Sequence, residues 1–139
     1  MNEPTASTVH VGLACRSETA VARFYGELLG LERASAKTLS AALALPLFGI
    51  DAELPVVNYV GPAAHFEIFL WEDVPPADRG AIHHVCLEVV DPEALAERAR
   101  SQGFDVVRVP RGDRWVTFIA DADGNRFELK LAPRRGIPR

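Results

Sequence analysis

The chain lacks several features, and each absence excludes a class of protein. No apolar stretch approaches the roughly 20 residues that a membrane-spanning helix requires. The N-terminus has no positively charged region followed by an apolar run, so we expect no signal peptide. Basic residues are not in excess, since 15 Lys and Arg stand against 19 Asp and Glu, for a net charge of −4. We therefore expect neither a membrane partner nor a nucleic-acid partner.

Cysteine is also scarce, with two in the whole chain. Cys15 and Cys86 each lie in an apolar run, which predicts buried free thiols in a reducing compartment and hence a cytoplasmic protein. The one basic cluster, at residues 134–139, is interrupted by glycine and proline and predicts a frayed, solvated tail.

The chain's size is that of one domain. Its 139 residues, 48% of them hydrophobic, are enough to bury a core without a disulfide or a structural metal. Any bound metal should therefore belong to a functional site rather than a structural one. No linker rich in glycine and serine divides the sequence, so we expect a single domain over 1–139.

An internal repeat organises this domain. The segment VHVGLACRSETAVARFYGELLGL from Val9 and the segment HHVCLEVVDPEALAERARSQGF from His83 align on His10 and His84. Both read as a histidine, a short apolar strand, a polar cap, a helix and a closing glycine. Repeats of this kind indicate two copies of one supersecondary unit.

The helices and strands of the repeat follow from local signals. Ser17 and Asp91 are suited to cap the two helices, and Pro92 suits the first helical position. Strand-like runs follow each helix. In the second half, the last two runs are joined by the turn residues 121–125. Each half therefore reads as β-α-β-β-β. The predicted fold is α+β, with paired βαβββ modules forming a cup-shaped, partly closed mixed β-sheet.

The expected boundaries are 7–72 for the first module and 80–132 for the second, with frayed tails at 1–6 and 133–139. The first module carries an insertion at about 36–50. Within it, residues 38–45 predict an extra helical turn or two before Pro46. Pro55 predicts that its strand lies at a sheet edge or begins later.

Strand alternation selects four candidate functional residues. In each half, apolar residues take one face of the first and last strands, and a histidine and a glutamate take the other. The repeat puts the two histidines in equivalent places, and likewise the two glutamates. A single histidine or glutamate on a strand face is usually solvated, but four at repeat-equivalent positions favour a metal site. Imidazole and carboxylate ligands suit Zn, Ni, Co, Mn or Fe. The predicted ligands are His10, Glu67, His84 and Glu128.

Other side chains are candidates for the surroundings of that site. His65 shares the face of Glu67, where it either lines the cavity or is an exposed strand-end residue. Phe69, Trp71 and Trp115 either supply stacking surface or pack in the core or an interface.

These segments resemble the vicinal oxygen chelate superfamily, which includes glyoxalase I, methylmalonyl-CoA epimerase, extradiol dioxygenases and bleomycin- or fosfomycin-resistance proteins. The resemblance covers nearly the whole chain. It is carried by HVGLACRSETAVARFYGELLGL from His10, FEIFLWE from Phe66, IHHVCLEVVDPEALAERARSQGF from Ile82 and FIADADGNRFELKL from Phe118. The resemblance implies paired modules around a metal, often in a homodimer, with ligands at the four positions already selected.

The resemblance also suggests a branch. The complete set of two histidines and two glutamates is similar to the ligand set of glyoxalases and epimerases. The asparagine-tryptophan-glycine stretch by which glyoxalase I helps bind glutathione is replaced here by residues 68–72, which argues against glutathione. Epimerases use a further acid of the first module as a second base, and Asp51 is the nearest candidate, with a solvated loop acid as the alternative.

The functional hypothesis is a metal-dependent isomerase, epimerase or lyase that transfers a proton at a carbon next to a carbonyl, through a metal-stabilised enediolate. Glu128 or Glu67 would act as the general base. The substrate would be a small molecule with a carbonyl or adjacent oxygens. Two alternatives stay open: a metal-free protein that binds a drug or natural product, and an Fe(II) dioxygenase of the extradiol type. Fold resemblance alone does not choose among them.

Overall fold

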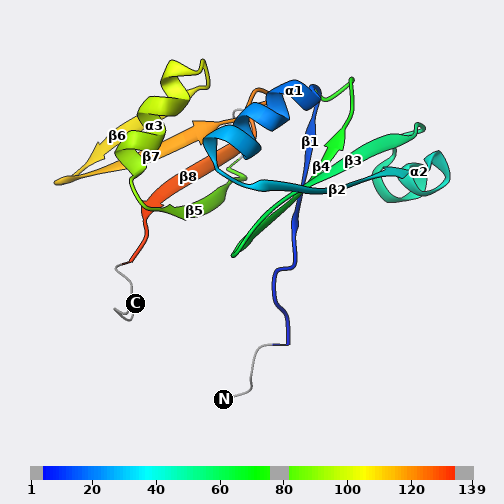
Figure 1. Ribbon diagram of the computed structural model, residues 1–139, viewed down its shortest axis with the longest axis horizontal. Helices are drawn as coiled ribbons and strands as arrows, with labels where there is room; N and C mark the ends of the chain where they lie inside the picture. The colour runs from blue at the N-terminus through cyan, green and yellow to red at the C-terminus, as the bar shows by residue number, and fades with distance from the viewer. Residues whose placement is uncertain (1–4, 76–81, 134–139) are drawn as a thin grey trace. The chain divides into compact units, whose positions relative to one another are not determined.

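A computed structural model describes residues 5–75 and 82–133 (Figure 1). The chain divides into two compact units, Met1–Val74 and Pro75–Arg139, and each is described by itself. Residues 1–4 and 134–139 of the expected tails, and residues 80–81 at the expected start of the second module, lie outside the described residues.

Each unit contains one predicted module. The elements of the first unit are β1 (Val11–Cys15), α1 (Glu18–Val21), the π-helix η1 (Ala22–Leu28), β2 (Glu32–Leu39), α2 (Ala41–Phe48), β3 (Leu54–Gly61) and β4 (Ala64–Leu70). Those of the second unit are β5 (Val85–Val89), α3 (Pro92–Ser101), β6 (Val106–Arg111), β7 (Arg114–Ala120) and β8 (Arg126–Leu131).

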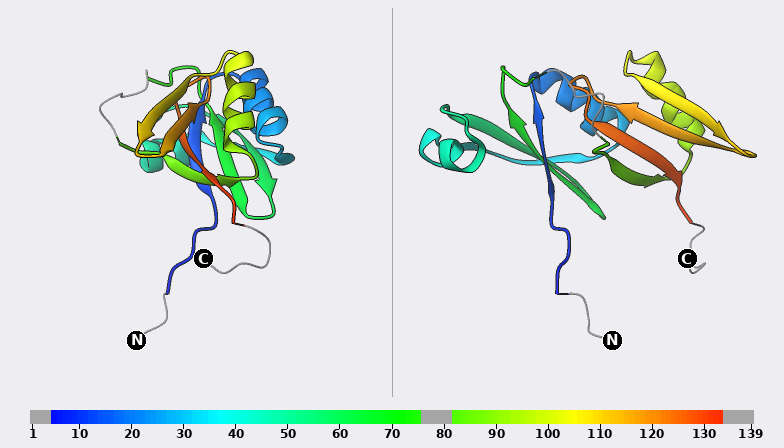
Figure 2. Two further views of the ribbon diagram at one scale, coloured as in Figure 1. Left: turned by 90° about the vertical axis from the view of Figure 1, so that its left-hand side faces the viewer. Right: turned by 180° about the vertical axis from the view of Figure 1, so that it is seen from behind.

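The two units have the same sheet topology. The strand orders are β1-β4-β3-β2 and β5-β8-β7-β6, and in each sheet the first and last strands of the module pair in parallel while the other pairs are antiparallel. Figure 2 shows that each four-stranded sheet is open. The predicted α+β fold with paired βαβββ modules is therefore confirmed, and each module forms a sheet of its own.

The first helical segment packs its apolar stripe on one face of its sheet. Ser17 caps it as predicted, since its Oγ accepts a hydrogen bond from the Ala20 amide at 3.2 Å. The segment widens into the π-helix η1, where the Leu29 amide donates to the Phe24 carbonyl. The rings of Phe24 and Tyr25 are fully buried, and Tyr25 lies 5.6 Å from Phe66 of β4. The face of β4 that carries Phe66 is therefore the core face.

Helix α3 has the corresponding place in the second unit. The Asp91 carboxylate accepts a hydrogen bond from the Ala94 amide at 3.0 Å, which confirms the predicted cap. Leu95, Ala96 and Ala99 are buried, as are Ile119 of β7 and Phe127 and Leu129 of β8. In both units one face of the sheet is thus covered by a helix of the repeat.

The segment between η1 and β3 differs from its prediction. Residues 32–39 form the strand β2, so the helical prediction is wrong for residues 38–39, and β2 rather than β3 is an edge strand of its sheet. Pro55 therefore lies in an interior strand, near its start. The expected helical turns are present as α2, but they run past Pro46 to Phe48. Pro46 lies inside the helix, where it removes one backbone hydrogen bond and crowds the preceding turn, and α2 ends two residues later at Phe48.

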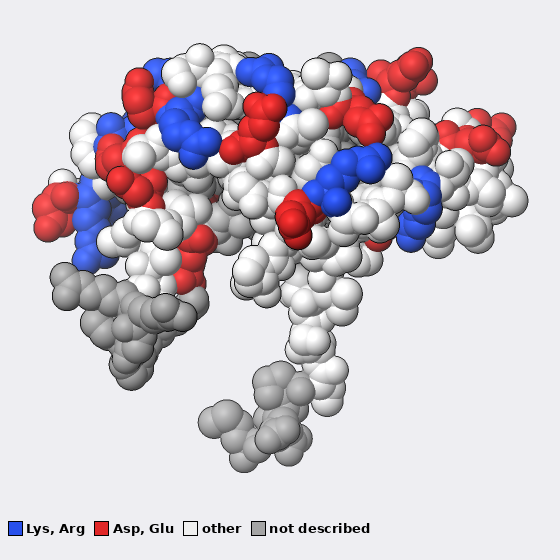
Figure 3. Space-filling view, in the orientation of Figure 1, with Lys and Arg blue, Asp and Glu red and all other residues white. Residues whose placement is uncertain are grey.

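Surface charge follows the composition. On the face shown in Figure 3, acidic and basic side chains are interspersed. Within the described residues, no helix is long and apolar enough to cross a membrane.

The cap of α1 gives a first prediction. Replacing Ser17 by Ala should lower the free energy of unfolding by about 1 kcal/mol, because the Ala20 amide loses its acceptor. The matched control is Ser40→Ala, since Ser40 precedes α2 but makes no side-chain cap hydrogen bond. Urea unfolding followed by circular dichroism measures both variants. Equal losses would show that the Ser17 hydroxyl is not a working cap.

Candidate metal-binding pairs

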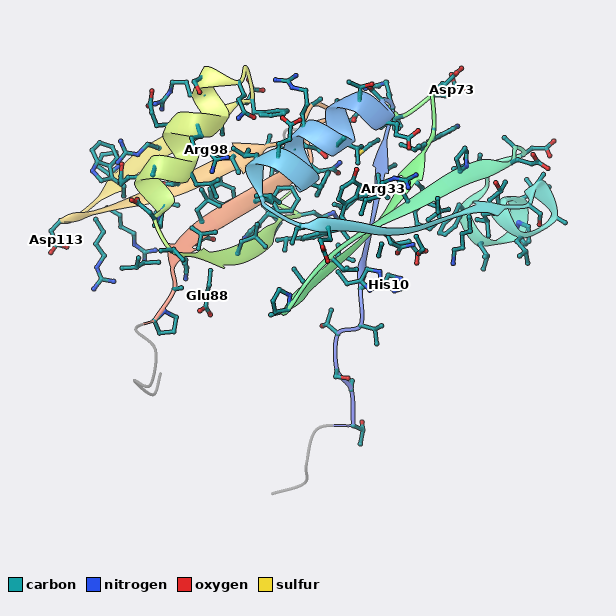
Figure 4. The ribbon with its side chains drawn as sticks, viewed as in Figure 1. His10, Arg33, Asp73, Glu88, Arg98 and Asp113 are labelled. Atoms are coloured by element: carbon teal, nitrogen blue, oxygen red, sulfur yellow. The ribbon has the colours of Figure 1, made fainter. Side chains whose placement is uncertain are left out.

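The first unit brings His10 and Glu67 together. In the parallel pair β1–β4, Gly12 lies opposite Glu67, so His10 and Glu67 share the sheet face opposite Phe66. His10 Nε2 lies 3.8 Å from Glu67 Oε2, and the Glu67 side chain is 16% exposed against 42% for His10. Figure 4 shows His10 where the chain enters β1, at the end of the strand that lies farther from α1.

A polar chain of side chains continues from this pair. The rings of His10 and His65 lie 5.6 Å apart. His65 Nε2 donates to Asn58 Oδ1 at 2.7 Å, and Asn58 Nδ2 donates to Ser35 Oγ at 3.2 Å. Asn58 is buried and lies directly opposite Glu67 in the β3–β4 pair. His65 is therefore held by Asn58 beside His10 and is not a free strand-end histidine.

The second unit brings His84 and Glu128 together by the same device. Cys86 lies opposite Glu128 in the parallel pair β5–β8, and His84 Nε2 lies 3.4 Å from Glu128 Oε1. Figure 4 shows the labelled Glu88 side chain of β5 projecting away from α3, which identifies the open face of this sheet. Glu88 and Cys86 alternate with the apolar residues of β5, so the His84–Glu128 pair lies on that open face.

The tautomer of His84 is set by a backbone carbonyl. His84 Nδ1 lies 2.7 Å from the Ile82 carbonyl oxygen. A carbonyl only accepts hydrogen bonds, so Nδ1 carries the proton, and a neutral ring then turns the lone pair of Nε2 toward the Glu128 carboxylate. Two lone-pair groups facing each other call for a proton or a cation between them. Ligand histidines are typically oriented by such a second hydrogen bond.

The spacing of the donor atoms fits a small divalent ion. Two donors that each lie about 2.1 Å from a tetrahedral ion are about 3.4 Å apart. The His84–Glu128 separation is 3.4 Å and the His10–Glu67 separation is 3.8 Å. Each pair is therefore close to the spacing that two ligands of one ion require.

The surroundings of Glu128 differ from those of Glu67. The Phe118 ring lies 5.1 Å from the His84 ring, edge to face, and Phe118 is opposite Glu128 in the β7–β8 pair. Lys130 Nζ lies 3.8 Å from Glu128 Oε2. Desolvation raises the pKa of the Cys86 thiol, and the Glu128 carboxylate adds to the rise, so Cys86 is protonated at neutral pH.

His10 and His84 lie just before their strands, because β1 and β5 begin at the residues that follow them. Cys15 is buried and outside any disulfide, as predicted, but the prediction of burial is wrong for Cys86, which is exposed because it lies on the open face. Trp115 and Glu128 lie on different faces of their sheet. On the Trp115 face, the Arg108 guanidinium lies 4.4 Å from the centre of the Trp115 ring.

The other predicted lining residues have different environments. Phe69 shares the face of Glu67 on β4, and its ring edge lies against Gly12. Trp71 follows β4, is partly buried, and donates its amide hydrogen to the Cys15 carbonyl. Asp51 is exposed in the loop between α2 and β3. The structure thus brings together one histidine and one glutamate in each unit, with His65 and Phe69 beside the first pair.

Two neighbours of the pairs were missed at the level of sequence. Asn58 and Phe118 occupy equivalent positions, each directly opposite the glutamate of its own unit. The signal that identifies them is register, because alternation within one strand does not say which residue of the next strand lies alongside. Once β3 and β7 are paired with β4 and β8, both residues follow.

Comparisons with known proteins agree with this fold. Residues 7–129 match the model of the Glyoxalase/Bleomycin resistance protein/Dioxygenase superfamily, and the chain belongs to that superfamily. A search of curated protein sequences finds no match.

Three solved structures illustrate the likeness. A glyoxalase family protein from Enterococcus faecalis is 20% identical with a TM-score of 0.69, over 90% of this chain and 97% of that one. The fosfomycin resistance protein FosX from Mesorhizobium loti is 18% identical with a TM-score of 0.66, over 92% and 93%. A variant of FosX from Listeria monocytogenes, solved with Mn(II) and 1S,2S-dihydroxypropylphosphonic acid, is 13% identical with a TM-score of 0.70, over 94% and 96%. At these identities the likeness concerns the fold.

The His84 tautomer gives a second prediction. In the metal-free protein at a pH where the ring is neutral, His84 should carry its proton on Nδ1, because Nδ1 is bound to the Ile82 carbonyl. Long-range ¹H–¹⁵N correlation spectra distinguish the two tautomers directly, and the His84→Ala variant assigns the resonance. A His84 ring protonated on Nε2 in the neutral state would contradict this geometry.

Proposed function

We propose that the protein is a metal-dependent enzyme that moves a proton at a carbon next to a carbonyl. The observation that supports it most is the His84–Glu128 pair, in which an Nε2 lone pair faces a carboxylate at the separation expected of two ligands of one ion. His10 and Glu67 repeat the same pair of donors. The proposed ligands of one divalent ion are His10, Glu67, His84 and Glu128.

The ion is of the class that imidazole and carboxylate donors favour, which includes Zn, Ni, Co, Mn and Fe. Bound there, it would act as a Lewis acid and stabilise negative charge that develops on a substrate oxygen. The two histidines would hold the ion in a fixed position. Their rings stay in place because the Ile82 carbonyl fixes His84 and because His65, bonded to Asn58, packs beside His10.

The carboxylates take the proton-transfer roles. Glu67 and Glu128 are the more enclosed members of their pairs, with side chains 16% and 21% exposed. A carboxylate in a partly dry site can accept a proton from carbon and return it. We assign the general base to one of these two, with Glu128 as the first choice, because the predicted second base Asp51 is exposed in a loop.

The substrate in this proposal is a small molecule with a carbonyl or two adjacent oxygens. Glutathione is not favoured, because the positions after Glu67 are occupied by Ile68, which is buried in the core, and by Phe69, which packs against Gly12.

A homodimer, implied by the resemblance, is part of the proposal. Metal content per chain and the mass in solution test it together, with one ion per chain and a mass twice that of the chain as the expected result.

Loss of either histidine ligand gives the third prediction. His84→Ala and His10→Ala should each weaken metal binding by about 100-fold or more, because changes even outside the ligand set cost 10–100-fold. Metal content after dialysis and the melting temperature with and without a chelator are the readouts, since metal bound to the native state raises stability.

His83→Ala is the matched control for these variants. His83 is adjacent in sequence to His84 but is exposed and has the opposite strand phase. It should bind metal as the unmodified protein does. Full metal content in the His84→Ala variant would contradict the assignment, and no uptake of any of the five metals by the unmodified protein would favour the metal-free binding protein.

Solvent exchange provides the fourth prediction. In D₂O, the metal-loaded protein should catalyse deuterium incorporation at the carbon next to the carbonyl of 2-oxo or 2-methyl-3-oxo acid derivatives, followed by proton NMR. Glu128→Gln and Glu67→Gln should lower the rate at least 100-fold for the residue that acts as base, since general base catalysis contributes about 10²–10⁴-fold. Oxygen consumption with catechols, without exchange, would instead identify the dioxygenase branch.

A further inference from the structure

We propose that the substrate carries an apolar substituent, which lies on Phe69 beneath helix α2 while its oxygens lie at the His10–Glu67 pair. This inference rests on the proposed function and specifies its substrate class. It makes Phe48 and Phe69 specificity-determining residues, a role that the metal ligands do not have.

The open face of the first sheet has a polar end and an apolar end. Glu67, Asn58 and Gly12 form one row across β4, β3 and β1. The next row of the same face, two residues along each strand, contains Phe69 and Val56. Two residues of a strand span about 7 Å, so the apolar row begins within the length of a small molecule from the Glu67 carboxylate.

Gly12 joins the two ends. A Cβ at this position would lie 3.4 Å from the Phe69 ring. Because Gly12 has no side chain, the Phe69 ring edge can approach the backbone of β1. Phe69 itself is only partly buried, which leaves ring surface available to a ligand.

Helix α2 covers the apolar end. The Phe48 ring lies 5.3 Å from the Phe69 ring, edge to face. Ala44 of α2 is fully buried, and Leu54 and Val56 are 2% and 1% exposed although they lie on the face that the repeat helix does not cover. Leu54 and Val56 have the strand phase of Asn58, so they share the face of Phe69, which α2 contacts through Phe48.

Helix α2 itself exposes much apolar surface. Its sequence is apolar throughout, and a helix that is apolar all round is ordinarily buried. Four large side chains are each at least half exposed, namely Leu43, Leu45, Leu47 and Phe48. Among them Phe48 contacts Phe69, and Phe69 lies in the row next to Glu67, so Phe48 is the exposed side chain of α2 that a hydrocarbon group of the substrate would cover.

The second unit lacks this arrangement. The residue equivalent to Phe69 is Lys130, two positions after Glu128, and no helix corresponds to α2 among residues 82–133. The apolar end beside α2 therefore belongs to the first unit, whereas Phe118 of the second unit lies beside His84 itself. A substrate with oxygens at one end and a hydrocarbon group at the other matches this division.

Alkyl hydroxamates test the inference, because the hydroxamate chelates a metal and the chain length can be varied. Members with two, four, six and eight carbons are titrated calorimetrically into the metal-loaded protein. Affinity should rise by up to about fourfold for each methylene group that is buried, and the rise should be lost in Phe48→Ala and restored in Phe48→Leu. Leu131→Ala, at an exposed apolar position in β8, should keep the full dependence.

The outcomes separate this inference from the proposed function. Equal binding of all four hydroxamates to the metal-loaded protein would overturn the inference and leave the metal site standing. If no metal binds, the proposed function fails, and the same series is titrated into the metal-free protein. There, binding of the eight-carbon member that Phe48→Ala weakens supports the apolar compartment, and its absence overturns it. A change of solution mass in Phe48→Ala without any chain-length dependence would show that a second copy covers α2.

Discussion

The parallel pairing of the first and last strand of each module positions every side chain of the candidate site. Gly12 stands opposite Glu67 and Cys86 opposite Glu128, so each glutamate is turned to the face that its histidine also occupies. A shift of this register by one residue would turn the glutamate into the core beside Tyr25 or Leu95, where an unpaired carboxylate is very costly. The helices α1 with η1 and α3 enforce the register, because they bury the alternate residues Phe66 and Ile68, or Phe127 and Leu129.

The features that depend on this alternation were predictable from sequence. The repeat, the caps at Ser17 and Asp91 and the faces of Glu67 and Glu128 all rest on local patterns of period two or 3.6. The strand β2 was not predictable in the same way. Residues 32–39 are almost entirely exposed, since β2 is an edge strand, so they carry no apolar alternation and are ordered by pairing with β3.

The environment of the candidate ligands depends on contacts that sequence patterns do not specify. The π-helix η1 and the continuation of α2 past Pro46 have no signal in the local sequence pattern, and the neighbours Asn58 and Phe118 follow only from the pairing of strands. The Ile82 carbonyl that sets the His84 tautomer comes from the backbone just before β5, and any residue type at that position offers the same oxygen. This is why the ligand types were visible in the sequence and the protonation of the ring was not.

The repeat makes the ligands equivalent but leaves their neighbours different. Asn58 in the first unit corresponds to Phe118 in the second, and Phe69 corresponds to Lys130. A divalent ion needs only the donor atoms that the two units share, whereas a substrate with unlike ends needs surroundings that differ. Duplication of one module supplies the first requirement, because it copies a histidine and a glutamate together with the parallel strands that hold them. Divergence at the row beside each glutamate supplies the second. Helix α2, which has no counterpart among residues 82–133, extends that difference from single residues to an apolar surface.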